Sequence, residues 1–530
     1  MRDAQLLKKL ENMTLEQKLC HVFTWDYYGT NDEQKAYIDD KLKRGCVGFL
    51  GVGFEPGFQD IIKRAKELAP NPILIGTDME TGYPPSKHKL PRVIALGYAD
   101  DKKLAYQYGK TVAVEAKRGG HNTVWGPVVD YRDTDALCKI MRSMAGNPEK
   151  IAELAEHYCQ ALKDEGMFFT VKHYPGSSDN SFDNHMCPTS SGKTEEQLLK
   201  EDMIPYLHLM KKGLLPGIMA SHMYFPKIDP DNYGTMSSKV LGIIRKQGFD
   251  GLILSDSMAM QGIVAKYGKE RSLLYAINAG IDLVMTPLHH EESYKLLLDA
   301  YNSGELSPER LDDAVYHVLA AQKWADREAL HNELSDEDIS EINRMYEDSV
   351  ALVKDDDIDT KLDDNKKRLF VVLKPNYYEP FDNPYIEGEK MHVEVTFARN
   401  WHPKDIKEYI KAEFPNDEIL EINEFPHRLN TIWLVDKACL VDEVIFMTYC
   451  VGESYGASDC LTIKMQNIIK SMHKKIGAVV HVGNPYAMED IEHVKRIVFL
   501  TTDKSIPYAL EILKGKKEAK GKVPFDIKLK

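Results

Sequence analysis

The stretch Met167-Phe168-Phe169-Thr170-Val171-Lys172-His173-Tyr174-Pro175-Gly176 sets a lysine and a histidine directly after an apolar run. The apolar run is typical of a buried strand, and the Pro-Gly pair ends it. A loop then follows that carries Asp183-Asn184-His185. This order is typical of a strand that carries polar groups into a site and continues into a loop with further reactive groups.

A second strand of this kind, Gly251-Leu252-Ile253-Leu254-Ser255-Asp256, ends on a single carboxylate. A carboxylate at a rigid strand end, together with an Asp/His pair on a loop, gives a candidate nucleophile and a candidate acid/base. Simpler interpretations remain open at this point. Asp256 would cap the following helix, and Asp183 with His185 would be a pair on a surface loop.

Short apolar strands alternate with amphipathic helical stretches such as Pro148 to Glu165 and Glu195 to Lys212. Repeated β–α order predicts a parallel sheet with helices outside it. Seven clear strands over roughly 300 residues fit a (β/α)8 barrel better than an open sheet. The predicted strands are Cys46–Leu50, Ile73–Gly76, Thr123–Trp125, Phe168–Val171, Gly217–Ala220, Gly251–Leu254 and Ile281–Met285.

Polar residues follow these strands where each one ends. They are Asp78, Asp130, Lys172, His173, His222 and Asp256. A barrel places its active site at the carboxyl ends of its strands, so residues far apart in sequence are expected to converge there. Two bland interpretations stay open: Lys172 and His173 would form structural ion pairs, and His222 would be a packed histidine.

The remainder of the chain predicts a second domain. A helical region runs from Pro308 to about Glu347, and a dense charge run then indicates a solvated linker. A second β/α series of short, continuously apolar strands follows, as expected when both faces of a sheet are covered. The fold class is therefore α/β, with an N-terminal (β/α)8 TIM-type barrel (1–345), a charged linker (346–368) and a smaller C-terminal α/β sandwich domain (369–530). Its predicted strands are Leu369–Leu373, Val393–Phe397, Val444–Met447, Ala478–Val482 and Ile497–Leu500.

Composition limits the class of protein. The 530 residues are 43% hydrophobic and 28% charged, with a net charge of -14, which argues against a nucleic-acid surface. No run of about 20 apolar residues predicts a membrane span, and the charged start of the chain does not resemble a secretory peptide. The eight cysteines form no C-x-x-C pair, so we expect reduced thiols and a cytoplasmic location. We expect no metal and no organic cofactor, because clustered ligand spacing and a phosphate-binding glycine loop are both missing from the sequence.

Several motifs together resemble glycoside hydrolase family 3, most closely its β-N-acetylglucosaminidase branch. That branch carries K-H-[FI]-P-G-x-G-x4-D-[ST]-H, which corresponds here to Lys172–Asp179 followed by Asp183-Asn184-His185. The strand pattern G-F-x-G-x-x-x-S-D corresponds to Gly248–Asp256. The segment Met13–Lys18 resembles the first helix of the family. The resemblance covers residues 1 to about 330 with specific motifs.

The resemblance implies a retaining exo-acting β-N-acetylglucosaminidase that acts on a small-molecule carbohydrate. Separately, we expect a monomer or a homodimer. Asp256 would attack the anomeric carbon and form a covalent glycosyl-enzyme. Asp183 and His185 would form the acid/base dyad, because an imidazole near neutrality both donates and accepts a proton. The residues that match sugar-binding positions are Lys172, His173, Asp78 and Arg142.

Departures from the pattern keep other activities open. The family loop D-x-E-G-G-x-V-x-R is here Asp78–Ser86, in which Thr81 replaces the first glycine and Ser86 replaces the closing arginine. A β-glucosidase or another β-hexosidase is therefore an alternative. A β-N-acetylglucosaminide phosphorylase is another, because a neutral imidazole does not repel phosphate as a carboxylate base would. A Schiff-base aldolase using Lys172, a sugar-binding protein without turnover, and an acid supplied by Glu453 complete the alternatives.

Overall fold

The structure is a computed structural model. It describes residues 2–27, 32–53, 57–131, 141–176, 178–179, 185, 187–268, 271–287, 289–356, 361–375, 381–382, 390–391, 401–450 and 460–529. The chain divides into two compact units. The first comprises Met1–Leu90, Lys102–Arg132 and Asn147–Ile342, and the second comprises Pro91–Asp101, Asp133–Gly146 and Asn343–Lys530.

Parallel strands form the centre of the first unit. They are β1 (Trp25–Asp26), β2 (Phe49–Gly51), β3 (Leu74–Thr77), β4 (Thr123–Val124), β5 (Phe168–Phe169), β6 (Val171–Tyr174), β7 (Gly217–Ala220), β8 (Leu252–Ser257) and β9 (Leu283–Met285). Neighbours in the chain pair in parallel from β1 to β5 and from β6 to β9. Bridges from Val128 to Lys172 and from Phe23 to Val284 join the two groups and close the ring. Counted over the described residues, with β5 and β6 as one strand interrupted at Thr170, this is an eight-stranded barrel, and the predicted barrel is confirmed.

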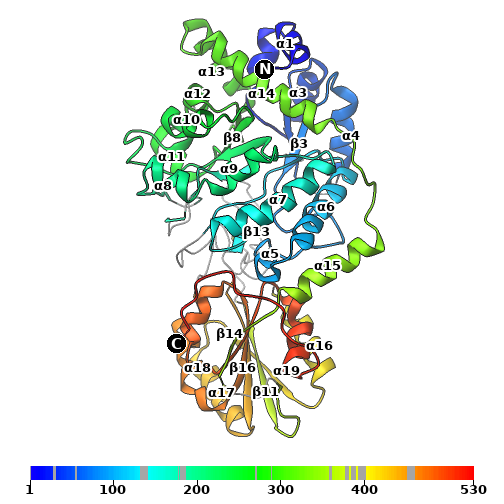
Figure 1. The fold of residues 1–530 in the computed structure, drawn as a ribbon, viewed down its shortest axis with the longest axis vertical. Coiled ribbons are helices and arrows are strands. Elements are labelled where there is room, and N and C mark those ends of the chain that lie inside the picture. Colours follow the sequence, from blue (N-terminus) through cyan, green and yellow to red (C-terminus); the bar gives the residue numbers. More distant parts are fainter. Residues whose placement is uncertain are drawn as a thin grey trace. The chain divides into compact units, whose positions relative to one another are not determined.

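Helices surround these strands (Figure 1). They are α1 (Ala4–Glu11), α2 (Leu15–His21), α3 (Asp32–Lys43), α4 (Phe58–Leu68), α6 (Lys102–Arg118), α7 (Pro148–Asp164), α8 (Glu195–Lys200), α9 (Ile204–Lys211), α10 (Ser238–Lys246), α11 (Gln261–Tyr267), α12 (Ser272–Ala279), α13 (His290–Ser303) and α14 (Pro308–Ala325), with the 3-10 turn η2 (Gly234–Met236). The local sequence determines where several of these helices begin. Asn147 and Ser307 cap α7 and α14 with Pro at the first helical position, and Thr194 forms a capping box with Gln197 at α8.

The interior of the barrel is filled by large side chains that point inward from the strands. The cluster includes Phe49, Leu74, Trp125, Phe168, Met219, Leu252, Leu254, Leu283 and Met285, all buried. A filled interior leaves the ends of the strands as the places where polar groups gather.

A mixed six-stranded sheet forms the second unit, in the order β10-β17-β16-β15-β11-β14. Only β10 runs antiparallel to its neighbour among these described strands. The strands are β10 (Ala351–Asp355), β11 (Arg368–Lys374), β14 (Glu418–Asn423), β15 (Glu443–Cys450), β16 (Ile476–Gly483) and β17 (Arg496–Leu500), with the short pair β12 (Phe381–Asp382) and β13 (Lys390–Met391). This is the α/β sandwich that the sequence predicts.

Helices cover both faces of this sheet, with α17 and α18 on one side and α16 and α19 on the other (Figure 1). The helices are α5 (Ile94–Ala99), α16 (Pro403–Glu413), α17 (Arg428–Cys439), α18 (Ile463–Ser471) and α19 (Ile506–Leu513), with η4 (His473–Lys475), η5 (Pro485–Ile491) and η6 (Asp503–Ser505). Helix α15 (Asp336–Asp348) contains the division between the two units.

Three differences from the sequence-based elements stand out. Strand β10 lies inside the segment 346–368 that we predicted to be a linker, and β14 and β1 were not predicted at all. The predicted strand Val393–Phe397 lies outside the described residues. The predicted boundaries 1–345 and 369–530 stay a prediction. Among the residues that the structure describes, none of the helices has the length and apolar content required to span a bilayer.

Candidate active site

Four polar segments meet at the carboxyl ends of neighbouring barrel strands. Asp78 follows β3, Lys172 and His173 lie on β6, His222 follows β7, and Asp256 lies on β8. The register places Lys172 beside Met219, and Ala220 beside Ser255, so the polar residues lie within a few positions of one another along the strands. Parallel strands therefore bring these groups to one face, as the sequence predicts.

Asp256 is a buried carboxylate of this face, with 8% of its surface exposed. Its Oδ1 accepts a hydrogen bond from the Ser257 N–H at 2.7 Å. Burial by itself raises the pKa of Asp256, but His173, His222, the Ser257 N–H and His185 together hold that pKa below the ordinary value of an aspartate. Asp256 is thus an ionised carboxylate at neutral pH, which is the form a nucleophile requires.

Three imidazoles, those of His173, His222 and His185, lower the pKa of Asp256. His222 is buried and lies 2.9 Å from the Ser257 carbonyl through Nε2 and 2.7 Å from the Thr235 hydroxyl through Nδ1. A carbonyl only accepts, so Nε2 carries a proton. Burial lowers the pKa of His222 despite the nearby Asp256 charge. This ring is neutral and each of its two nitrogens has a hydrogen-bond partner, which is the environment of a packed histidine.

Asp130 holds His173 in a fixed orientation. The β6–β7 ladder shifts between Lys172 and Tyr174, which frees the His173 N–H, and that group donates to Asp130 Oδ1 at 3.3 Å. The other carboxylate oxygen lies 2.7 Å from His173 Nδ1. Nδ1 therefore carries the proton and donates a hydrogen bond to Asp130. The sequence placed Asp130 among the strand-end residues expected at the active-site face but assigned it no catalytic or sugar-binding role.

Lys172 is buried and ion-paired. Its ammonium lies 2.5 Å from Asp78 Oδ1 and 2.9 Å from Glu80 Oε1. Asp78 is 59% exposed at its side chain, so its carboxylate remains open to a ligand while it holds the lysine. Two carboxylates stabilise the charged amine, whereas a Schiff base needs a neutral one. The ion pair argues against the aldolase interpretation and leaves a charged donor at the site.

The turn that follows β6 is anchored by a buried ion pair. Lys193 lies 2.7 Å from Asp202 Oδ2 and donates to Ser178 Oγ at 2.5 Å, and the Ser178 N–H donates to Asp202 Oδ1 at 2.9 Å. Gly176 has a φ of +115°, and a Cβ there would come within 2.5 Å of Asp202. Ser178, which stands where the family pattern K-H-[FI]-P-G-x-G has its second glycine, therefore ties the start of the loop to Asp202.

His185 is half-buried and lies near Asp256, as its effect on the pKa of that carboxyl requires. Asp183, its predicted partner, lies outside the described residues, as does Glu453. Arg142 is half-buried and belongs to the second unit. The structure thus brings together Asp256, His185, His173, Lys172 and Asp78. The roles predicted for all of these residues stay predictions.

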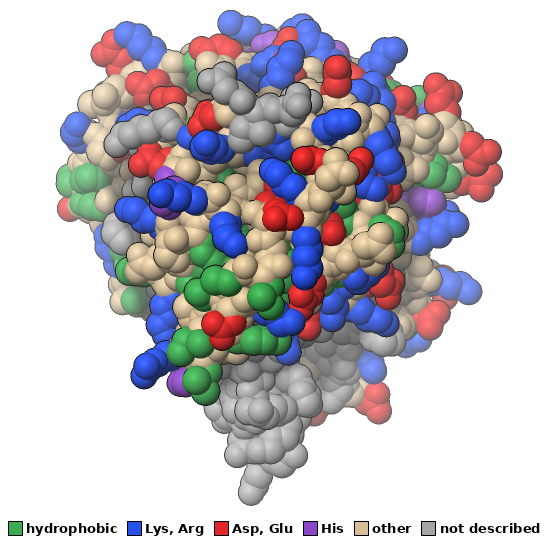
Figure 2. Space-filling view, turned by 90° about the horizontal axis from the view of Figure 1, so that it is seen from below, with side chains coloured by type: hydrophobic (Ala, Val, Ile, Leu, Met, Phe, Trp, Pro, Cys, Tyr) green, Lys and Arg blue, Asp and Glu red, His purple; other side chains and the backbone are tan. Residues whose placement is uncertain are grey.

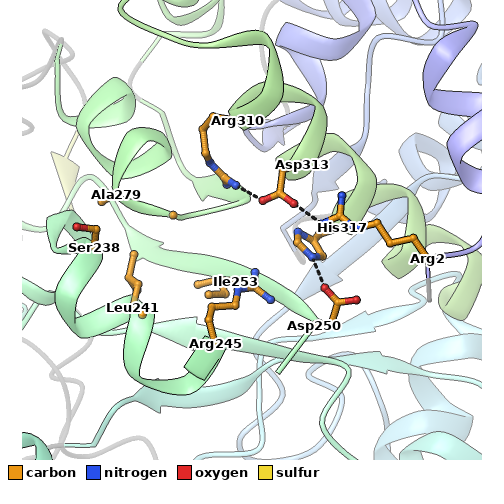
Figure 3. A pocket seen from close by; sticks show the side chains of 12 residues that line it. Arg2, Ser238, Leu241, Arg245, Asp250, Ile253, Ala279, Arg310, Asp313 and His317 are labelled. Carbon is orange, nitrogen blue, oxygen red and sulfur yellow. Dashed lines mark hydrogen bonds and ion pairs between the residues drawn. The ribbon is translucent and has the colours of Figure 1, made fainter. Parts of the chain in front are cut away.

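A second polar cluster lies at the opposite end of the barrel, beside the amino ends of β8 and β9. It lines a cavity of about 300 Å³ (Figure 3). Asp282, Asp313 and His317 have ligand atoms within 4.8 Å of one another. However, Arg245 and Arg310 already occupy both oxygens of Asp282, at 2.7 and 2.8 Å. We interpret the cluster as an ion network that closes this end of the barrel, because active sites of such barrels lie at the opposite end, at the carboxyl ends of the strands.

Comparison with known proteins decides the family. The sequence model of the glycosyl hydrolase family 3 N-terminal domain matches residues 51–321, just over half of the chain. The chain belongs to glycoside hydrolase family 3. This confirms the resemblance found in the sequence motifs. The matched region contains every barrel residue of the candidate active site.

Curated relatives of this family 3 chain are β-hexosaminidases. The protein of Nitrosomonas eutropha is 30% identical over 275 residues, which cover 49% of this chain and 78% of that protein. The protein of Idiomarina loihiensis is 29% identical over 236 residues, covering 43% and 71%. Among solved structures, a family 3 β-N-acetylglucosaminidase from Paenibacillus sp. str. FPU-7 has a TM-score of 0.80 at 22% identity, covering 98% of this chain and 100% of that one. A β-glucoside phosphorylase has a TM-score of 0.81 at 20% identity, covering 98% and 95%. These two likenesses show the shared two-part fold.

Proposed function

We propose that the protein is a retaining, exo-acting β-N-acetylglucosaminidase that removes terminal β-linked N-acetylglucosamine. The observation that carries this proposal is Asp256, an ionised carboxylate at the end of β8 whose pKa three imidazoles lower. The curated β-hexosaminidases that the barrel matches support the choice of sugar.

The proposed reaction proceeds in two steps. First, an oxygen of Asp256 attacks the anomeric carbon while His185 gives a proton to the leaving aglycone oxygen, which forms a glycosyl ester. Second, His185 takes a proton from water as that water attacks the anomeric carbon, which restores the Asp256 carboxylate. Asp183 would orient His185 and stabilise its cationic form.

Sugar hydroxyls would be held by the groups beside Asp256. His173, fixed by Asp130, presents its other ring nitrogen, and Lys172 with Asp78 offers adjacent donor and acceptor groups. Arg142 is the remaining predicted sugar-binding residue. Ser86 occupies the place of the closing arginine of the family loop, and its Oγ accepts the His88 N–H at 2.9 Å. Because Ser86 replaces that arginine, the preference for an N-acetyl substituent has to be tested by turnover of different glycosides.

A cytoplasmic location belongs to the same proposal. In the part of the chain that the structure describes, Cys20, Cys46, Cys159 and Cys439 are thiols without a disulfide, which fits a reducing compartment.

Turnover of a panel of aryl β-glycosides tests the proposed function. We expect release from the N-acetylglucosaminide and much weaker release from the glucoside. Preference for the glucoside would move the activity to a β-glucosidase while keeping the mechanism. No turnover of any glycoside by folded protein would contradict the proposal.

Phosphorolysis is the second candidate, favoured by the nature of the acid/base. His185 in its neutral form carries no charge to repel phosphate, unlike the carboxylate acid/base common in retaining glycosidases. The same panel, run with and without phosphate, separates the two reactions. A sugar 1-phosphate product would identify a phosphorylase, and free sugar at an unchanged rate would identify a hydrolase.

A further inference from the structure

Helix α17 is apolar on its solvent side as well as on the side that packs on the sheet. Leu434 and Ala438 are buried. On the other side, Leu429, Ile432 and Trp433 are between 45% and 67% exposed. A surface helix normally carries polar residues outside, and a helix that is apolar all round is normally covered. The outer side of α17 therefore has the composition of an interface.

More exposed apolar side chains extend this surface beyond the helix. Ile463 opens α18, and the Thr462 hydroxyl donates to the Glu424 carbonyl at 2.8 Å, so Ile463 lies near Phe425. We define the α17 face as Phe425, Leu429, Ile432, Trp433, Val435, Leu440 and Ile463, which are 41% to 74% exposed. Figure 2 shows hydrophobic side chains gathered in one area of the surface that it presents.

The size of the α17 face fits a protein partner. Phe425 and Trp433 are aromatic side chains, which cover about 150–250 Å² each when fully buried, and with the five aliphatic side chains the exposed parts add to several hundred Å². Specific interfaces bury about 800 Å² on each partner, and a monomer rarely exposes an apolar patch larger than a few hundred Å². The area is thus close to what a stable dimer needs from each subunit.

Charge placement on α17 is complementary to itself in an antiparallel arrangement. Arg428 and Asp436 lie four positions before and after Ile432. Both are exposed, and among the residues that the structure describes neither forms an ion pair within the subunit. Two copies of α17 that cross at Ile432 would place each Arg428 opposite Asp436 of the partner subunit. Leu429 would then lie opposite Val435 of the partner subunit.

We propose that a second copy of this chain covers the α17 face, forming a homodimer with its two-fold axis at Ile432. A two-fold interface uses the same patch on both subunits, and its contacts repeat as i with j and j with i. Arg428 and Asp436 are spaced equally on either side of Ile432 and carry opposite charges, which satisfies that condition. For this reason we prefer a second copy of the chain over a different protein. The proposal does not depend on the proposed enzyme function.

Sedimentation velocity of the full chain at micromolar concentration tests the proposal. We expect a species of twice the 60.4 kDa chain mass. Ile432→Glu places two carboxylates at the axis and should give monomer only. The matched control is Leu330→Glu, since Leu330 is 68% exposed and lies outside the α17 face. This variant should dimerise like the wild type.

Charge reversal tests the register. Arg428→Asp and Asp436→Arg should each raise the dimer dissociation constant about tenfold, because each creates like-charge contacts twice across the axis. The double reversal restores both pairs and should recover wild-type affinity. A wild type that sediments as a monomer, a dimer that survives Ile432→Glu, or a double reversal that dimerises no better than the single variants would each overturn the proposal. Circular dichroism of every variant confirms that it is folded.

Discussion

Replacing Asp130 by asparagine tests a residue that acts on the proposed site through His173. Asp130 is buried and accepts from both the N–H and Nδ1 of His173. Asparagine keeps the shape and removes the negative charge. The variant therefore changes the hydrogen bonding and charge of His173 while leaving the strand ends in place.

The expected loss follows from the hydrogen bond that is weakened. A hydrogen bond to a charged group contributes about 1.5–3 kcal/mol, and about 1.4 kcal/mol corresponds to a factor of ten in rate. We expect kcat/KM on an aryl N-acetyl-β-glucosaminide to fall about 10- to 150-fold. The acid limb of the profile of kcat/KM against pH should also move to higher pH. Activity requires ionised Asp256 and is lost as the pH falls through its pKa. That pKa rises when the positive potential at His173 weakens.

A matched control exists elsewhere in the barrel. Glu165 holds His331 in the same way, with Oε1 2.6 Å from Nδ1 and Oε2 accepting the backbone N–H at 3.0 Å. Glu165 caps the end of α7, away from the carboxyl ends of the strands. Glu165→Gln should lower stability without changing kcat/KM or the acid limb. The reasoning is refuted if folded Asp130→Asn keeps kcat/KM within a factor of two and an unchanged acid limb.

Three further predictions concern the loop anchor, the base of the barrel and the buried histidines. Lys193→Met leaves the Asp202 carboxylate buried without its cation, so the free energy of unfolding should fall by about 3–5 kcal/mol. Turnover should also fall more for aryl glycosides with poor leaving groups, which need the acid, than for dinitrophenyl glycosides; equal losses on both would contradict a role in positioning the loop. Asp282→Asn, which strips two arginines of their partner, should lower stability by a similar about 3–5 kcal/mol in a denaturant titration, with kcat unchanged in the folded fraction. Burial lowers the pKa of His21 and His481 to about 4 from 6.5. As the pH falls, the unfolded chain binds these protons before the folded chain does. The free energy of unfolding is therefore highest above pH 6.5, and protonation of each histidine lowers it by about 3 kcal/mol by pH 4. Thermal unfolding at several pH values measures this loss.

The sequence predicted those parts of the fold and site that depend on local pattern. The apolar runs of β7 and of the start of β8 are followed by Ser221 and Ser255, and α14 begins at a Ser-Pro cap, so apolar pattern and capping located these elements. β1 was missed because only Trp25-Asp26 form it. A strand this short gives no recognisable pattern.

The sequence could not predict which residues pair across the fold. The helix predicted over 195–212 is divided into α8 and α9, and Asp202 in the gap pairs with Lys193. Likewise, the role of Asp130 depends on a contact with His173, 43 positions away. Such contacts depend on how distant segments pack, which neither periodicity nor capping reports. The α17 face was hidden for the same reason, since an apolar helix in the sequence predicts a buried one.

Trapping of a glycosyl-enzyme tests the central claim, that Asp256 is the nucleophile, most directly. A His185→Ala variant given a dinitrophenyl N-acetyl-β-glucosaminide should form the ester readily, because this leaving group needs no acid, and release it slowly without a base. Intact-protein mass spectrometry after rapid quenching should then show one added N-acetylglucosaminyl group, and peptide mapping should place it on Asp256. An adduct on another residue, or undiminished turnover by Asp256→Ala, would contradict the account.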